Sequence, residues 1–467
     1  MRPDASGPLA GLFPASPPSP SQAPTRRALS VVAQAAAVGL GALLLLERVP
    51  GLPSWDTVYG EDYWMFLTQA LQQPWHVFIQ FGGYEELLPR VMAQFAIYLP
   101  LPQASRLFAV CGALVAAGCG LFVFHASAGH IRSLLLRALL GAAVVLAPMA
   151  LMEIADSGTG SPWYLMLAMF WALLWRPRTR TGMAIAALVA FAAMTSEVIV
   201  VLFAPLVAAR LFVLRRPREH AVTAGWLAGC LVQLPAVLSG YFSGQSRLTR
   251  QPGTLGNSLA FYAHDSVLPS FGWHLAWRLE SFAGKNGATV TVAVILVAVI
   301  GAILVAQPGN RPFVVTAVLT GFAFSVVSTT LTPNVATYPL VTPSLESGSR
   351  YSVLPIFLFE AVAIVGVDYL LRQRDGGRPQ DGSSKGAGRR WRWPAPVPAI
   401  AVAALVAVLA AGWVADFRYA SFRSRASWNW GPIAASWQRD CAKSASGEIV
   451  VKAGATWQTL PCDRIRP

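Results

Sequence analysis

Long apolar runs, separated by short segments rich in arginine, constrain the fold of this chain more than any other feature. They recur from residue 28 to residue 414, and several approach the roughly 20 helical residues that cross the hydrocarbon core of a bilayer. Charged residues make up only 12% of the 467 positions, about half the fraction of an ordinary soluble protein. Only helices and closed barrels satisfy their backbone in lipid, and the alternation typical of a barrel is absent. The sequence therefore predicts an all-α polytopic membrane protein.

The apolar runs predict a transmembrane bundle that extends over residues 28–414. About eleven membrane-spanning helices are expected, at 28–46, 104–126, 133–151, 161–175, 182–194, 198–213, 221–241, 287–306, 312–331, 350–371 and 396–414. Outer loops are expected at 47–103, 242–286 and 332–349, the first of them with short interfacial helices. Residues 415–467 are expected to form a small exoplasmic C-terminal segment.

The basic residues fix the expected orientation. Residues 1–27 are rich in Pro, Ser and Ala, which predicts a disordered cytoplasmic tail, and Arg26 and Arg27 hold the start of the first helix inside. A cleaved signal peptide is the alternative, but its apolar region would be shorter and no small-residue cleavage site precedes Glu47. Heavy use of Ala, Arg and Pro indicates a GC-rich bacterial genome. We expect a multi-pass plasma membrane protein with a cytoplasmic N-terminus and an exoplasmic C-terminus.

The stretch 181–214 decides the direction of every later helix. Basic clusters flank it on both sides, so the positive-inside rule favours two short helices that turn near Thr195-Ser196-Glu197. A single long helix is the alternative, and it would place the basic stretch Arg372–Arg392 outside. The basic inner loops favour the hairpin.

The cysteines fit the same orientation. Cys111, Cys119 and Cys230 lie in predicted helices, where a thiol behaves as a small apolar group. Cys441 and Cys462 lie in the C-terminal segment and could close a small loop by a disulfide, which belongs in an oxidising compartment. Two unrelated free thiols are the alternative.

The net charge of +14 does not indicate nucleic acid. Most of the excess lies in inner loops and at helix ends, where it sets orientation and meets anionic lipid, so membrane lipids are the expected partners. The six histidines are scattered without paired spacing, so no metal-ligand cluster is predicted.

The first outer loop carries the densest chemical signal. Asp56, Glu61 and Asp62 lie among aromatic residues directly after the first apolar run. Acids at headgroup depth invite a functional explanation. One of them could act as a general base on an acceptor hydroxyl, or hold a divalent cation beside a leaving phosphate. The alternative is a purely structural role, in which these acids cap helices or keep the loop solvated.

Arginines at outer helix ends are candidate phosphate ligands. Arg90 and Arg350 each begin an apolar run near an aromatic residue, Tyr84 or Tyr351. A guanidinium binds phosphate through paired hydrogen bonds, and Arg247 with Arg250 in the large outer loop forms a second candidate pair. Arginines that only snorkel to the interface are the alternative. Further substrate-binding candidates are Glu153, Glu197 and His264, each with a structural alternative.

The chain resembles the GT-C superfamily of integral-membrane glycosyltransferases. The resemblance rests on the Glu61-Asp62 pair directly after the first helix, an interfacial helix in that loop, and a many-helix bundle with an outer C-terminal portion. The stretches Gly83-Tyr84-x-x-Leu87-x-Pro89-Arg90 and Ser349-Arg350-Tyr351-x-x-Leu354-Pro355 are similar to segments of bacterial members. No motif identifies a branch.

The resemblance implies transfer of a sugar, with inversion, from a polyprenyl-phosphate donor to a glycan, lipid or protein acceptor of the cell envelope. The catalytic base maps onto Asp62 first, with Glu61 or Asp56 as substitutes, and no cofactor is required beyond a divalent cation in some branches. A transporter, flippase or polymerase of lipid-linked glycans is the competing class. It would show internal repeats or ionisable residues deep in several helices, whereas the acids here gather at one surface.

Overall fold

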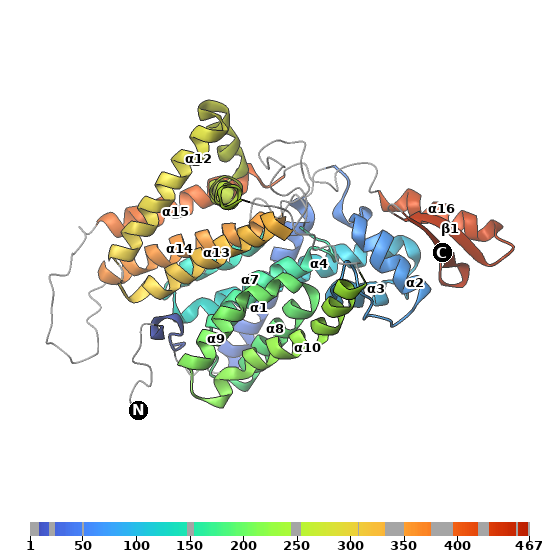
Figure 1. Ribbon diagram of the computed structural model, residues 1–467, viewed down its shortest axis with the longest axis horizontal. Coiled ribbons are helices and arrows are strands. Elements are labelled where there is room, and N and C mark those ends of the chain that lie inside the picture. Colours follow the sequence, from blue (N-terminus) through green and yellow to red (C-terminus); the bar gives the residue numbers. More distant parts are fainter. Residues whose placement is uncertain are drawn as a thin grey trace.

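The computed structural model of the protein describes residues 9–17, 24–48, 51–146, 154–243, 254–306, 308–331, 350–374, 396–418, 429–453 and 456–465. Within these ranges the chain is mostly helical (Figure 1). The bundle consists of α1 (Pro24–Arg48), α4 (Ala104–Ala126), α5 (Leu134–Leu146), α7 (Ser161–Leu174), α8 (Arg180–Ser196), α9 (Ala204–Val213), α10 (Ala221–Phe242), α12 (Trp273–Ala306), α13 (Arg311–Leu331), α14 (Arg350–Arg374) and α15 (Pro396–Ala415).

Where they are described, the apolar runs predicted to span the membrane lie on these helices to within a residue, except that 198–213 is divided between a 3-10 segment, Val198–Phe203, and α9. Residues 147–151 of the third run lie outside the described residues. Five segments of the described residues are long and apolar enough to cross a bilayer, namely 28–48, 101–129, 217–242, 311–330 and 350–372. The fold is therefore that of an α-helical protein with multi-pass membrane character, while the count of eleven spans stays a prediction.

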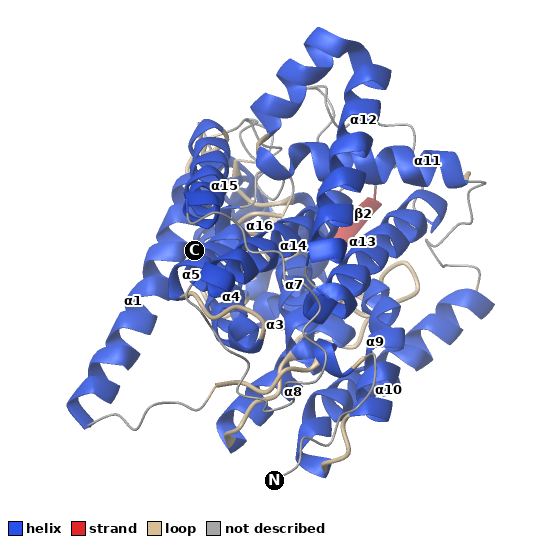
Figure 2. Ribbon diagram, turned by 90° about the vertical axis from the view of Figure 1, so that its left-hand side faces the viewer, coloured by secondary structure: helices blue, strands red, loops and turns tan. Residues whose placement is uncertain are grey.

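The bundle is packed around α7, which lies near its centre (Figure 2). Every side chain from Ser161 to Leu174 is buried, as expected of a helix that is apolar all round. Glycines let neighbouring helices approach closely: a Cβ on Gly225 of α10 would lie 2.2 Å from the Ala187 carbonyl oxygen of α8. Small residues serve this purpose in lipid, where no hydrophobic force draws helices together.

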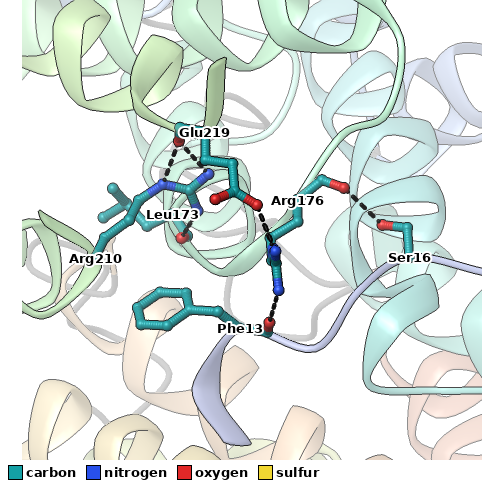
Figure 3. A network of polar contacts seen from close by, with 6 residues as sticks. All are labelled: Phe13, Ser16, Leu173, Arg176, Arg210 and Glu219. Atoms are coloured by element: carbon teal, nitrogen blue, oxygen red, sulfur yellow. Dashed lines mark hydrogen bonds and ion pairs between the residues drawn. The ribbon is translucent and has the colours of Figure 1, made fainter. Parts of the chain in front are cut away.

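The stretch 181–214 doubles back on itself. Arg176, before α8, forms an ion pair with Glu219, after α9, with Nη2 and Oε1 2.5 Å apart (Figure 3). Arg210 of α9 donates hydrogen bonds to the carbonyl oxygens of Leu173 and Glu219. Both flanks of the stretch therefore lie at the same end of the bundle, as the two-helix interpretation predicts. The turn is made by Glu197, in extended conformation, and a 3-10 segment, η6 (Val198–Phe203).

The N-terminal segment 9–17 departs from the predicted disordered tail. Leu12 and Phe13 are buried in the main core, and Arg176 donates a hydrogen bond to the Phe13 carbonyl oxygen at 3.3 Å (Figure 3). Composition alone suggested disorder, but two adjacent large apolar residues suffice to dock the segment. The carboxylate of Asp368 on α14 accepts a hydrogen bond from the backbone N–H of Ser133 at 2.8 Å. The predicted inner loop before Ser133 therefore lies at the same end of the bundle as the end of α14.

The first outer loop and the C-terminal segment form a joint lobe at the opposite end (Figure 1). The loop contains a π-helix, η3 (Asp62–Leu67), then α2 (Thr68–Gln72) and α3 (Leu87–Ala96). The C-terminal segment contains α16 (Trp430–Lys443) and the antiparallel strands β1 (Glu448–Ala453) and β2 (Thr456–Pro461). The hairpin is a departure from a purely helical fold.

Specific contacts hold this lobe together. Gln72 donates to the Thr459 carbonyl oxygen at 2.9 Å, and the Trp430 indole donates to the Leu101 carbonyl oxygen at 2.8 Å. A disulfide joins Cys441 to Cys462, as the closed-loop interpretation requires. The first loop and the C-terminal segment therefore share one side of the bundle.

The outer loop predicted at 242–286 is largely helical where it is described. It contains α11 (Leu255–Ala260), a second π-helix η8 (Phe261–Val267), the 3-10 turn η9 (Leu268–Phe271) and the first part of α12, up to a kink at Gly284.

Replacing Cys441 and Cys462 together by serine is expected to loosen the C-terminal unit. The bond closes a loop between residues 21 positions apart, and freeing such a loop costs about 3 kcal/mol in the chain-entropy account. Limited trypsin digestion should cleave residues 430–465 faster in this variant than in Cys230→Ser, a matched substitution in α10. Equal cleavage rates would show that the contacts with the first loop hold the unit without the disulfide.

Candidate functional site

A polar cavity lies where the first loop, the start of α7, the turn after α8 and the start of α14 meet. It is lined by Glu61, Phe81, Tyr84, Glu86, Thr159, Pro162, Trp163, Glu197, Val198, Ile199, Arg350 and Tyr351. The sequence-predicted candidates Glu61, Tyr84, Glu197, Arg350 and Tyr351 are thereby brought together from three of these parts, namely the first loop, the turn after α8 and the start of α14. A larger groove between α5, α14 and α15 is lined almost entirely by Ala, Val and Leu, so it offers no comparable chemistry.

The carboxylate of Asp62 assembles one wall of the cavity. Asp62 is fully buried and accepts hydrogen bonds from the backbone N–H of Gly158 at 3.0 Å and of Thr159 at 2.8 Å, and from the Thr159 hydroxyl at 2.7 Å. A Cβ on Gly158 would lie 2.9 Å from the Asp62 carboxylate, so glycine is required for this approach. Asp62 therefore holds the turn before α7 and is not among the cavity-lining residues.

Glu61, the neighbour of Asp62, faces the cavity instead. Its Oε2 lies 3.9 Å from Nη1 of Arg350, whose guanidinium also lies over the ring of Tyr351 at 5.3 Å from the centroid. This contact joins a charge of the first loop to a charge at the start of α14. The prediction that an acid of the first loop and Arg350 share a site is met by Glu61 and not by Asp62.

A tight turn presents Tyr84 and Glu86 to the cavity. Phe81 and Tyr84 form an antiparallel bridge around Gly82 and Gly83, whose φ angles are 63° and 91°. Residues other than glycine rarely adopt such positive φ angles. The two glycines thus let the chain reverse in four residues, directly before α3.

Burial shifts the protonation of the cavity carboxyls. Desolvation, together with the nearby carboxylates of Glu61 and Glu197, raises the pKa of Glu86 to about 8, against the opposing charge of Arg90. Desolvation likewise raises the pKa of Glu197 to about 7, opposed by the backbone N–H of Ile199. Near neutral pH, Glu86 therefore holds its proton and Glu197 is poised between its two forms.

Arg90, the other predicted phosphate ligand, lies behind the cavity wall. It is buried on α3, donates to Gln69 Oε1 at 2.6 Å, and stacks over the ring of Phe66. Arg90 is not among the cavity-lining residues, but its positive charge lowers the pKa of Glu86, which is one of them.

Two other predicted residues lie outside the lining. Asp56 ends a 3-10 turn, η2 (Ser54–Asp56), and His264 is buried on η8. His264 Nδ1 lies 2.6 Å from Asp265, and its Nε2 lies 3.6 Å from Glu280. Glu153, Arg247 and Arg250 fall outside the described residues.

Sequence reasoning missed the rest of the lining, namely Phe81, Glu86, Thr159, Pro162, Trp163, Val198 and Ile199. A signal existed in Asp156-Ser157-Gly158-Thr159-Gly160, because two glycines in three residues mark a closely packed turn. A Cβ on Gly160 would lie 1.9 Å from the Ile154 carbonyl oxygen. Among the described residues, no three acidic, histidine or cysteine side chains are grouped to hold a metal ion.

No family model matches this sequence, and no curated protein is significantly similar to it.

Asp62→Ala is expected to destabilise the fold, because it leaves the buried N–H groups of Gly158 and Thr159 without an acceptor. Each unsatisfied donor costs about 1–3 kcal/mol. Asp62→Asn keeps one acceptor oxygen and should lose less. Thermal unfolding in detergent would rank the variants as wild type, then Asp62→Asn, then Asp62→Ala. Equal stability of Asp62→Ala and wild type would contradict the structural role.

The free energy of unfolding should fall as pH rises from about 4.5 to 8. The folded protein keeps protons on Glu86 and Glu197 that the unfolded chain, with an ordinary glutamate pKa of 4.5, has released. Each group lowers the free energy of unfolding by about 1.4 kcal/mol per pH unit, Glu197 up to about pH 7 and Glu86 up to about pH 8. Denaturant unfolding from pH 5 to 8 should show a flatter profile in the Glu86→Gln, Glu197→Gln double variant. An unchanged slope would exclude these carboxyls as its source.

Proposed function

We propose that the protein is a GT-C type membrane glycosyltransferase, which moves a sugar from a polyprenyl-phosphate donor to a glycan, lipid or protein acceptor of the envelope. The observation that carries the proposal is the pairing of Glu61 with Arg350 in one polar cavity beside the membrane-spanning helices. Such a pair supplies a carboxylate for proton removal and a guanidinium for a phosphate at the same place.

The roles follow from these positions. Arg350 binds the donor phosphate, with its fork of N–H donors directed at the phosphate oxygens. Glu61 takes the proton of the acceptor hydroxyl as that oxygen bonds to the sugar C1. The bond from C1 to the phosphate oxygen breaks on the opposite face, C1 inverts, and polyprenyl phosphate leaves with the negative charge. Asp62, the first candidate for the base, instead holds the cavity wall.

Glu86 contributes as a neutral group near neutral pH, and Glu197 does so in its protonated form. A protonated carboxyl donates a hydrogen bond and does not repel an anionic donor. The rings of Trp163 and Tyr351, which pack edge-to-face at 5.2 Å between centroids, present an apolar surface for a sugar ring. A divalent cation is not needed for these roles.

The disulfide supports the orientation with this cavity on the exoplasmic side. Cys441 and Cys462 are bonded in a unit that packs on the first loop, and disulfides persist in oxidising compartments. The opposite end, with the N-terminal segment and the Arg176–Glu219 pair, then faces the cytoplasm of a bacterial cell.

A carrier of lipid-linked glycans is the second candidate. Glu360 in α14 favours it, since this carboxyl is fully buried and neither oxygen has a hydrogen-bond partner in the described part of the chain. An acid inside a membrane helix is often part of an ion pathway. The grouping of Glu61, Glu86 and Glu197 around one arginine favours the enzyme.

Glu61→Gln should lower polyprenyl phosphate release by at least about 100-fold, because loss of a general base costs that much or more. Purified protein would be assayed in proteoliposomes with a polyprenyl-phosphate sugar and a membrane acceptor extract. Arg350→Gln should raise the donor concentration needed for half-maximal rate, and Arg350→Lys should restore it only in part. Asp440→Asn, a surface change on α16, is the matched control.

Two outcomes would count against the proposal. Release by Glu61→Gln at the wild-type rate would remove Glu61 as the base. Transbilayer movement of the lipid-linked sugar by the wild-type protein, without release of polyprenyl phosphate, would establish the carrier.

A further inference from the structure

A buried glutamine interrupts the otherwise apolar contact face of α10. Six buried positions of α10 follow alternate spacings of four and three residues, namely Val222, Trp226, Gly229, Gln233, Ala236 and Gly240, and Thr223 is buried beside the first of them. This spacing is typical of a helix seam that packs on another helix, here α8. An amide in such a seam is unfavourable in a membrane unless its donors and acceptor are satisfied.

Gln233 satisfies its amide on the backbone of a single residue of the first loop. The N–H of Glu85 donates to Gln233 Oε1 at 2.9 Å, and Gln233 Nε2 donates to the Glu85 carbonyl oxygen at 2.8 Å. Gln233 is 2% exposed, so water does not compete for these bonds. The pair of bonds fixes the plane of the chain at Glu85.

Two further contacts hold the same turn. A Cβ on Gly240, two helical turns after Gln233 on the same face, would lie 2.3 Å from Gly83 Cα, so α10 touches the turn directly there. The Leu88 N–H donates to the Ser196 hydroxyl at 3.1 Å. The turn is thus held before, at and after Glu85, by α10 and the end of α8.

The held residue lies between two cavity residues. Tyr84 and Glu86 flank Glu85, and both line the cavity. Hydrogen bonds that fix the backbone between Tyr84 and Glu86 also fix the directions of these two side chains. Supporting residues hold functional groups in place in this way.

We propose that Gln233 is a positioning residue of the cavity: its amide clamps the backbone of Glu85 and thereby directs Tyr84 and Glu86 at the substrate. The claim about substrate rests on the proposed transferase function, whereas the claim about the clamp does not.

Two substitutions at this position separate the clamp from simple packing. Gln233→Met has similar length but neither hydrogen bond, so the clamp is lost at every pH. In Gln233→Glu, a protonated carboxyl still accepts from the Glu85 N–H and donates to its carbonyl oxygen. The ionised carboxylate still accepts from the Glu85 N–H but has no proton to donate and repels the carbonyl oxygen, so the clamp is complete at low pH and keeps only one of its two bonds at high pH. Thr223→Val, a buried change at the other end of α10, is the control for helix packing.

The primary measurement is hydrogen–deuterium exchange of a peptide that contains Glu85, with protein in lipid nanodiscs at several pH values. After correction for the intrinsic pH dependence of exchange, Gln233→Met should exchange at least about fivefold faster than wild type, the factor expected for one lost hydrogen bond. Gln233→Glu should match wild type at acid pH and should exchange faster than wild type but more slowly than Gln233→Met at alkaline pH, because its carboxylate keeps the bond from the Glu85 N–H. Polyprenyl phosphate release should follow the same order.

Each other outcome has a defined meaning. Unchanged exchange in Gln233→Met, or an equal rise in Thr223→Val, would overturn the clamp. Exchange that follows the expected order while release of polyprenyl phosphate by Gln233→Met stays at the wild-type rate would overturn the positioning role. Absence of release by the wild type would reject the transferase proposal, and the exchange data would still decide the clamp.

Discussion

The hydrogen bonds between the Asp62 carboxylate and the turn at Gly158 and Thr159 are the interaction on which the candidate site depends. A carboxylate this deeply buried is stable only when its oxygens are satisfied, and an unpaired one costs several kcal/mol. The first loop therefore cannot move away from the start of α7 without exposing or stranding this charge. Because Glu61 precedes Asp62 and Trp163 follows the turn, the same bonds bring two walls of the cavity together.

Adjacent acids consequently do different work. Asp62 is the first residue of the π-helix η3, and its carboxylate oxygens are occupied by hydrogen bonds to the turn before α7. Glu61 lines the cavity and forms an ion pair with Arg350. A π-helix shifts the direction of successive side chains relative to an α-helix, and such segments are common at functional sites. A first-loop acid is thus not interchangeable with its neighbour, and the more deeply buried one is the poorer candidate for proton transfer.

The sequence predicts the helices well because apolar length and periodicity directly determine burial in a membrane protein. It also predicts the doubling back at 181–214, since arginines on both flanks must stay on one side. The site is predicted only in part: Glu61, Glu197 and Arg350 are recognisable as charges at helix ends. The sequence does not reveal that backbone N–H groups 96 and 97 residues away bind the Asp62 carboxylate, so Asp62 was the first candidate for the base.

The missed features are tertiary in the same sense. Thr159 reaches the cavity only because Asp62 holds its backbone, and the polarity of Gln233 has meaning only once its partner, Glu85, is known. The Pro- and Ser-rich composition around Leu12 and Phe13 predicted disorder, although these two residues are buried in the core. In each case the residue type was visible and its partner was not.

Charge balance in the cavity implies an order of events for the proposed reaction. Three glutamates and one arginine would repel an anionic donor if all were ionised, but burial keeps Glu86 protonated near neutral pH and Glu197 partly so. The remaining charges, Glu61 and Arg350, are only loosely paired at 3.9 Å. A donor phosphate makes shorter, bidentate bonds to the guanidinium and so displaces Glu61 from it. In the proposed reaction the donor phosphate and Glu61 therefore compete for Arg350, and this competition favours binding of the donor before the acceptor.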